Sequence, residues 1–580
     1  MPLRSRAVRR AFALSIAALA IHTAAGGDES PITQWIRQTA TPFETCEPHE
    51  DHRDLAALRQ IVGDAHIVAL GEGTHGTREF FQLKHRITEY LATEMGFTTF
   101  AIEANLPEAQ RVNEYVLTGR GDAREAIRGM YFWTWNTEEV LALVEWMRKY
   151  NASGRGRMEF VGFDMQTPDT AAAIVRRFVQ RLEPMLVDSV SAIMTKISLA
   201  SGPVAGFVTA TGTFPVVAAA GRHVRFSGLI RTESVTGFAG LWWRADVGRA
   251  SRAFDNMQKQ EVNATRDWKR YDIALDIPAD ATNINFGMLM SGKGRAWFDS
   301  LEIDIDGKRW QDGATFDLSL ERADGPIGFG NYAAPGYSIA MDDKVASVGK
   351  RSLRLASVDG AKAPGAPGSA GEAIAAAERL TQRLEAGRGR YARATTPAET
   401  DWALRNAQVL LQRARLADSN RGYMVRDSAM AANIEWIVDR APKGSKIVLW
   451  AHNGHVQRRE GFMGSWLAKR YGKDMVVIGQ TTNEGYYTAI KTGLGTHELK
   501  RGPPGSFEAF AHDAGIPRFL LELRRARENA AVATLLRTGV SMRSIGGMAM
   551  DVQFSPTPIL DDYDVLTYID KTEATRPIVK

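Results

Sequence analysis

Residues 66–81 place a short apolar run, a glycine-rich loop and the start of a helical pattern next to one another. The run 67–70 has no polar residue and ends at a glycine, which is typical of a strand buried on both faces of a parallel sheet. After Thr77, a residue type that favours the N-cap position, apolar residues recur at helical spacing. The intervening loop carries Glu72 and His75, so a carboxylate and an imidazole are predicted at the carboxyl end of a strand, where open parallel sheets bind ligands.

Further strand patterns lie at residues 96–105, 158–164 and 446–451. Acidic or histidine residues again stand at or just after their carboxyl ends. Helical patterns lie between them, which favours an α/β fold with a mostly parallel sheet flanked by helices. Because parallel strands end at the same edge of a sheet, the side chains that follow them should converge on one crevice. The residues delivered in this way are Glu103, Asp164, His452 and His455.

The middle of the chain has a different sequence pattern. Between residues 200 and 358, turns rich in Gly, Thr and Asn separate short alternating segments, and this spacing predicts an inserted all-β, jelly-roll-like sandwich. It resembles the carbohydrate-binding modules of secreted enzymes, which implies a possible glycan partner. The aromatic candidates for stacking on a sugar are Trp242, Trp243, Trp268 and Trp297, of which at least two are expected in the core.

The insertion divides the α/β domain into two halves. We expect the first half at residues 29–195 and the second at 372–580. Residues 359–371, rich in Ala, Gly and Pro, are predicted to be a flexible linker between the sandwich and the second half.

The first 25 residues have the pattern of a secretory signal peptide. Four arginines among residues 4–10 precede the apolar run 11–21, which is too short for a stable membrane anchor, so we expect export to the periplasm or the extracellular space. Without those arginines the net charge of +5 falls to +1, which gives no support to nucleic-acid binding. Cys46 is the only cysteine and cannot form an intrachain disulfide, so the core alone must stabilise the exported protein.

The polar strand ends suggest hydrolysis. His75 would act as a general base on water, and Glu72 or Glu103 would fix its tautomer and stabilise the imidazolium. His452 or His455 would polarise the carbonyl or protonate the leaving oxygen. This hypothesis requires no cofactor.

Two other hypotheses use the same sequence features differently. The histidines and acids could bind zinc or another divalent metal, although the spacing His452-x-x-His455 suits a helical metal site less well than His-x-x-x-His. Alternatively, the chain could be a glycan-binding protein with a degenerate α/β domain.

The glycine loop also matches a dinucleotide fingerprint, with glycines at 71, 73 and 76. However, Glu72 would place negative charge where the pyrophosphate approaches, and Glu103 lies 27 residues past the last glycine rather than about 20. We therefore interpret this match as accidental. The chain contains no Gly-x-Ser-x-Gly, so a serine nucleophile is unsupported.

Several of these segments together resemble the erythromycin esterase family. The resemblance covers about residues 30–190 and 375–575, and it implies an α/β fold and metal-independent hydrolysis of a macrolide lactone by activated water. The segments that carry it are Gly71-Glu72-Gly73-Thr74-His75-Gly76-Thr77-Arg78-Glu79-Phe80-Phe81, Glu103, Gly162-Phe163-Asp164, Arg426-Asp427 with Met430 and Asn433, Trp450-Ala451-His452-Asn453-Gly454-His455, Arg543-Ser544-Ile545-Gly546 and Tyr563-Asp564.

The same resemblance implies roles for individual residues. His75 matches the general base, Glu72 and Glu103 match the active-site carboxylates, and His452 and His455 match a second histidine cluster. Two departures are present, since Lys84 stands where the resistance enzymes carry an arginine, and those enzymes lack the β insertion. The substrate-binding candidates are His455, Lys84, Arg78, Asp164 and Arg426.

Overall fold

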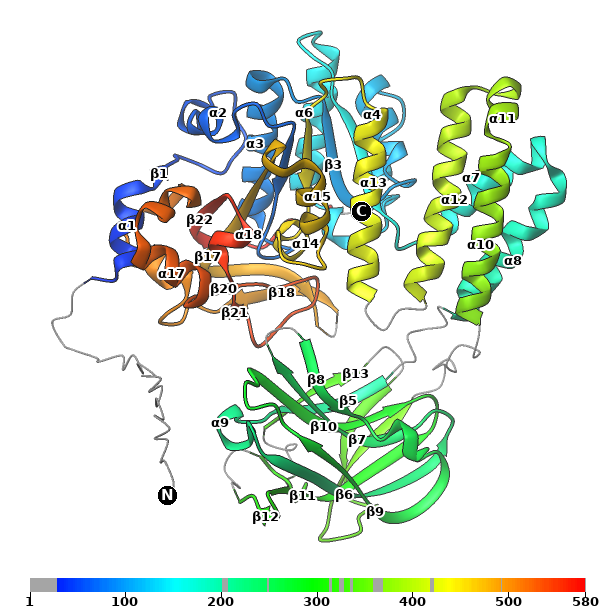
Figure 1. Ribbon diagram of the computed structural model, residues 1–580, viewed down its shortest axis with the longest axis vertical. Coiled ribbons are helices and arrows are strands. Elements are labelled where there is room, and N and C mark those ends of the chain that lie inside the picture. The colour runs from blue at the N-terminus through cyan, green and yellow to red at the C-terminus, as the bar shows by residue number, and fades with distance from the viewer. Residues whose placement is uncertain are drawn as a thin grey trace, which may run out of the picture. The chain divides into compact units, whose positions relative to one another are not determined.

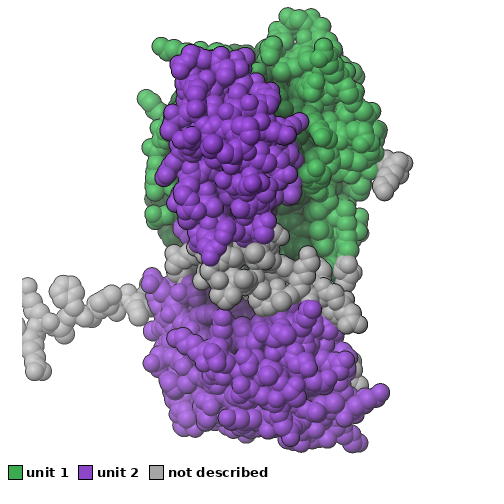
Figure 2. All heavy atoms as spheres, turned by 90° about the vertical axis from the view of Figure 1, so that its right-hand side faces the viewer, with its two compact units in different colours: residues 1–164, 430–580 green, residues 165–429 purple. Residues whose placement is uncertain are grey.

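The computed structural model describes residues 29–200, 207–247, 250–311, 316–322, 328–333, 337–357, 369–417, 422–491 and 493–578. The predicted signal peptide and most of the predicted linker lie outside these ranges. The chain forms two compact units, residues 1–164 with 430–580 and residues 165–429 (Figure 2). Among the described residues, every helix is too short or too polar to cross a bilayer.

The first unit is built on a nine-stranded sheet, counted over the described residues. From β22 to β4 its neighbouring strands are parallel, whereas β1, β19 and β18 pair antiparallel. The predicted mostly parallel α/β architecture is therefore confirmed. In spatial order the strands are β1 (Thr41–Pro42), β19 (Arg518–Glu522), β22 (Val565–Thr572), β17 (Met475–Ile490), β2 (Ile67–Leu70), β16 (Ile447–Trp450), β3 (Thr99–Asn105) and β4 (Glu159–Asp164), with β18 (Leu494–Leu499) on β17.

Strands from the two ends of the chain interleave at the centre of this sheet. β16 lies between β2 and β3, with Trp450 opposite Leu70 on one side and Ile102 on the other. All four residues of β2 and of β16 are buried, as their uninterrupted apolar sequences predict. The insertion therefore interrupts the sequence of the sheet without separating its central strands.

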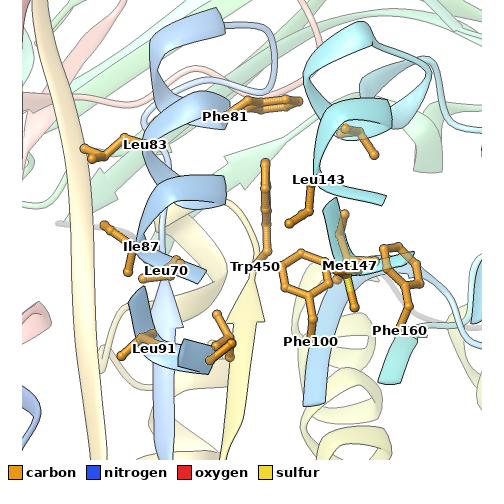
Figure 3. Close-up of a cluster of buried hydrophobic side chains, with 14 of the residues drawn as sticks. Leu70, Phe81, Leu83, Ile87, Leu91, Phe100, Leu143, Met147, Phe160 and Trp450 are labelled. Carbon is orange, nitrogen blue, oxygen red and sulfur yellow. The ribbon is translucent and has the colours of Figure 1, made fainter. Parts of the chain in front are cut away.

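Helices cover both faces of the sheet (Figure 1). One face packs on α3 (Arg78–Met95), α4 (Gln110–Thr118) and α6 (Glu138–Ala152). In this core the indole of Trp450 meets Phe81 edge-on at 4.9 Å between ring centres and Phe100 at 5.9 Å (Figure 3). The other face packs on α1 (Pro31–Thr39), α13 (Gly422–Arg440) from Met430 onward, α15 (Met463–Tyr471), α16 (Phe507–Asp513) and α17 (Ala530–Thr538). Shorter helices are α2 (Ala57–Val62), α5 (Ala123–Arg128), α14 (Asn453–Val456) and α18 (Ile559–Asp562).

Part of the predicted α/β halves belongs to the second unit instead. Its helices share a core of their own, in which Val175, Ile193 and Leu410 are fully buried. The sheet-bearing unit ends at Asp164 and resumes at Met430, because the helices between these points pack on one another and add no strand to the sheet. They are α7 (Asp169–Leu182), α8 (Val187–Ala200), α10 (Ser369–Ala386), α11 (Arg388–Ala394) and α12 (Pro397–Ala417).

The inserted segment is an all-β sandwich, as predicted. Its described strands form two antiparallel sheets, in the orders β13-β5-β10-β7-β8 and β14-β15-β11-β6-β9, with β12 beside β11. The strands are β5 (Phe207–Thr213), β6 (His223–Val235), β7 (Ala239–Val247), β8 (Ala250–Asp255), β9 (Ala264–Asp276), β10 (Asn283–Ser291), β11 (Arg295–Ile305), β12 (Lys308–Arg309), β13 (Phe329–Ala333), β14 (Tyr337–Asp342) and β15 (Ser352–Ser357), with the short helix α9 (Val216–Ala219).

The tryptophans considered for sugar stacking divide into two pairs. Trp243 and Trp297 are buried in the sandwich, and the Trp297 indole donates to Asp342 Oδ2 at 2.9 Å. Trp242 and Trp268 are half-buried. Glycan binding by this domain stays a prediction.

Candidate active site

The loop between β2 and α3 is shaped by close backbone approach. A Cβ on Gly71 would lie 2.3 Å from Asn453 Oδ1, and a Cβ on Gly76 would lie 1.9 Å from the carbonyl oxygen of Thr488. Only glycine fits at such contacts. Glycines at these positions therefore allow the loop to pack closely against α14 and β17. This packing accounts for the match to the dinucleotide fingerprint without a bound nucleotide.

Thr77 occupies the N-cap position of α3, as predicted, but its hydroxyl does not cap the helix. It is hydrogen-bonded to the Thr74 hydroxyl at 2.5 Å instead, and both residues are fully buried. This bond ties the two ends of the short segment that contains His75.

A chain of three side chains runs from α3 to this loop. Glu72 Oε2 accepts a hydrogen bond from Lys84 Nζ at 2.5 Å, and Glu72 Oε1 lies 2.9 Å from His75 Nδ1. Because a carboxylate only accepts, Nδ1 carries a proton, so the tautomer that this contact favours has its lone pair on Nε2. Glu72 and Lys84 are fully buried, whereas 13% of the His75 side chain is exposed. The arrangement orients an imidazole whose side chain is partly exposed to solvent.

Lys84 is paired with Glu72 in the interior. Its ammonium also donates to the carbonyl oxygen of Ala451 at 3.0 Å and lies 4.8 Å from the centre of the Trp450 ring. Burial lowers the pKa of Lys84 to about 8, and the neighbouring carboxylate of Glu72 opposes this shift. The side chain has no exposed surface, and the substrate-binding role of Lys84 stays a prediction.

His452 is held by hydrogen bonds at both ring nitrogens. Its Nδ1 accepts from the Gly454 N–H at 2.9 Å, and its Nε2 lies 2.9 Å from the carbonyl oxygen of Ile545, to which it donates. Burial, together with the nearby rings of His75 and His455, lowers the pKa of His452 to about 3. The ring is therefore neutral, and in this arrangement neither nitrogen is available to exchange a proton with a substrate.

Glu103 links the two histidines that follow β16. Its Oε2 accepts from the backbone N–H of His452 at 3.0 Å, and its Oε1 lies 3.2 Å from His455 Nε2. Its carbonyl oxygen accepts from the Trp135 indole at 3.0 Å, and the Trp135 ring meets His75 edge-on at 6.2 Å between centres. The ends of β2, β3 and β16 thus converge as expected, and the carboxylate that fixes the His75 tautomer is Glu72.

The other expected substrate-binding residues lie in varied surroundings. His455 has 16% of its side chain exposed. Arg78, the first residue of α3, donates to Glu573 Oε2 at 2.9 Å and lies 3.5 Å from Glu47 Oε1. Asp164 is fully buried at the end of β4, and Arg426 is half-buried in the part of α13 that belongs to the second unit.

Two residues of the site, Asn453 and Ile545, were not among the site residues predicted from the sequence. The Asn453 amide bonds both ways with the Gln480 backbone, at 3.1 Å and 2.8 Å, and the Asn453 N–H donates to the Glu72 carbonyl at 2.8 Å. Ile545 holds His452 through its carbonyl and donates its N–H to the Gly73 carbonyl at 2.9 Å. Both lie inside motifs of the family resemblance, but a backbone carbonyl that orients a histidine leaves no mark in a side-chain pattern.

Metal binding was an alternative hypothesis for these histidines and acids. Over the described ranges, no group of three or more His, Cys, Asp or Glu side chains is arranged to hold a metal ion.

Comparisons with known proteins agree with this architecture. The chain is 33% identical over 132 residues to erythromycin esterase type II of Escherichia coli, a match that covers 23% of this chain and 31% of that protein. The chain spans about a third of the length of the curated relatives it matches.

Alignments with solved structures span nearly the whole chain. A Bacillus cereus protein of known crystal structure aligns with a TM-score of 0.59 and 19% identity, covering 94% of this chain and 98% of that one. A histidine-to-asparagine variant of the erythromycin esterase EreC, in its open conformation, aligns with a TM-score of 0.52 and 14% identity, covering 92% and 97%. The family model for erythromycin esterase matches residues 92–225 and 341–572. The chain therefore belongs to the erythromycin esterase family.

Proposed function

We propose that this protein is an exported hydrolase that cleaves a carboxylic ester or lactone with a water molecule activated by His75. The observation that carries the proposal is the chain of contacts from Lys84 through Glu72 to His75. It orients one partly exposed imidazole through Nδ1, which leaves Nε2 as the nitrogen that can accept a proton, the arrangement that general-base catalysis requires. Membership of the erythromycin esterase family supports the same reaction class.

The reaction can be written with these groups alone. His75 Nε2 removes a proton from water while the water oxygen attacks the ester carbonyl, and Glu72 stabilises the imidazolium through its Nδ1–H. The tetrahedral intermediate then collapses, the bond to the leaving oxygen breaks, and the imidazolium returns its proton to that oxygen. The products are an acid and an alcohol, which stay in one molecule if the substrate is a lactone.

The second histidine cluster completes the site. Glu103 holds both the His452 backbone and the His455 ring, and His455 reaches solvent at its edge. We assign His455 to orienting the substrate. His452, with both nitrogens bonded, keeps Ile545 and the Glu72 loop in place.

The experiment is turnover of a panel of activated esters and macrolides by the purified protein after exhaustive chelation. We expect hydrolysis to survive chelation and to be lost in His75→Ala, with an unchanged circular dichroism spectrum. His66→Ala is the matched control, because His66 pairs with Asp474 immediately before β2, away from the strand end that carries Glu72. Activity that needs a metal to return would favour the metallohydrolase hypothesis, and glycan binding without any turnover would favour a binding protein.

Export rests on the leader pattern within residues 1–25. Amino-terminal sequencing of protein recovered outside the cytoplasm tests it. We expect the mature chain to begin close to residue 26, and a chain that retains the leader contradicts export by this route.

A further inference from the structure

A closed loop at residues 544–553 begins beside the active site. The Ser544 N–H donates to the Gln553 carbonyl at 3.0 Å, which brings the ends of the loop together. The Gln553 side chain fixes that closure, since its Oε1 accepts from the Lys500 N–H at 2.9 Å and from Arg543 Nη1 at 2.5 Å. We call residues 544–553 the methionine loop.

The inner end of the methionine loop is part of the site already described. The Ile545 N–H donates to the Gly73 carbonyl, and the Ile545 carbonyl accepts from His452 Nε2, both at 2.9 Å. Its backbone thus lies between the loop that carries His75 and the end of β16.

The outer side of the loop exposes apolar side chains. Met548 is 48% exposed, Met550 is 43% exposed and Val552 is 73% exposed. Their backbone is nevertheless well anchored, because the Ala549 N–H donates to the Ile490 carbonyl at 2.8 Å and the Met550 N–H to the Tyr487 hydroxyl at 3.3 Å. An ordered loop that holds large apolar groups towards water is a mark of a binding surface.

A second apolar segment lies against it. Tyr131 is 64% exposed and adopts a φ of 66°, a strained conformation for a residue with a Cβ, while Phe132 and Trp133 are half-buried. A Cβ on Gly547 would lie only 3.6 Å from the Trp133 ring, so the two segments are neighbours. Two residues after this segment, the buried ring of Trp135 meets His75 edge-on.

We propose that the methionine loop and residues 131–133 form an apolar surface that binds the hydrocarbon part of the ester, so that preferred substrates carry a large apolar group next to the scissile bond. The inference rests on the proposed function and names its substrate class. Methionine side chains are flexible and polarisable, which suits a surface that must fit apolar groups of different shape. Both segments lead within a few residues from a buried side chain that packs in the site, Ile545 or Trp135, to the exposed apolar groups, and this closeness to His452 and His75 is the reason for naming the substrate as the occupant.

The test is a series of p-nitrophenyl esters with acyl chains from two to ten carbons. In the wild type kcat/KM should rise with chain length, by at most roughly fourfold for each methylene that becomes fully buried. In the double variant Met548→Asp with Met550→Asp, the ratio of kcat/KM for the octanoate to that for the acetate should fall at least about tenfold. The matched control is Met185→Asp, because Met185 is 79% exposed but belongs to the second unit, and it should keep the wild-type ratio.

An unchanged ratio in the double variant overturns the inference while leaving ester hydrolysis intact. A wild-type dimer that dissociates in the double variant also overturns it, because the surface would then bind a second copy. If the wild type hydrolyses no ester, the proposed function fails. The apolar surface is then tested separately, by measuring the binding of the non-hydrolysable 2-decanone through the change in tryptophan fluorescence. Binding weakened by the two aspartates supports the surface, and equal binding overturns it.

Discussion

The rings of His75 and His452 lie 4.9 Å apart, centre to centre, although the entire β sandwich separates them in the sequence. They differ in what their nitrogens can do. His75 is bonded through Nδ1 to Glu72 and has a partly exposed outer edge, whereas His452 is bonded at both nitrogens and almost fully buried. The pair therefore combines an imidazole bonded at one nitrogen, the proposed general base, with an imidazole bonded at both nitrogens.

Glu72→Gln should lower kcat by about 10²- to 10⁴-fold, the usual range for loss of effective general-base catalysis. The amide keeps the size of the side chain but cannot stabilise the imidazolium that forms at His75. Steady-state kinetics on the best ester measures the effect. Glu94→Gln, at the exposed pair with Arg59, is the control, and a comparable loss in that variant would remove the case for Glu72.

We expect catalytic activity to fall at alkaline pH, because Lys84 then loses its charge. Because burial lowers its pKa to about 8, it loses its charge above that pH, and Glu72 loses the partner that orients it. Stability should move in the opposite direction: between about pH 8 and 10.5 the unfolded chain binds the proton that the folded chain has released, so the free energy of unfolding rises with pH.

The pH–rate profile of Lys84→Arg tests this assignment. A guanidinium stays charged in alkali, so the alkaline limb of kcat should move to higher pH in any variant that folds. Urea unfolding between pH 8 and 10.5 measures the stability contribution. An alkaline limb at the same pH in both proteins would show that another group controls it.

His452 should destabilise the protein in acid. Its folded pKa of about 3 lies below the ordinary value of 6.5, so between these two pH values the unfolded chain binds a proton that the folded chain does not. The free energy of unfolding therefore falls as the pH falls from 6.5 towards 3. Urea denaturation across this range, beside an NMR titration of the ring protons, checks the prediction, and a His452 ring that titrates near pH 6.5 in the folded protein contradicts it.

Gly71→Ala and Gly76→Ala should destabilise the first unit by about 1–3 kcal/mol or more, since each added Cβ meets atoms of α14 or β17 at less than contact distance. Gly371→Ala is the control, because Gly371 lies in α10 and a Cβ there meets nothing within 4 Å. Chemical denaturation compares the three variants. If both loop variants were as stable as the control, the packing explanation of the glycine motif would be wrong.

Local pattern was enough to predict the mostly parallel α/β fold, the β sandwich inserted into it, and the histidines and acids that gather at the strand ends. An uninterrupted apolar run such as 67–70, or helical spacing after Thr77, reflects burial within one element and can be read without knowing its neighbours. Tertiary structure decided the rest. The position of β16 next to β3 pairs Glu103 with His455, and the backbone carbonyl of Ile545 accepts a hydrogen bond from His452. Strand order and backbone hydrogen bonds depend on segments far apart in the chain, and carbonyl groups are common to every residue, so the side-chain sequence carries no local signal for either.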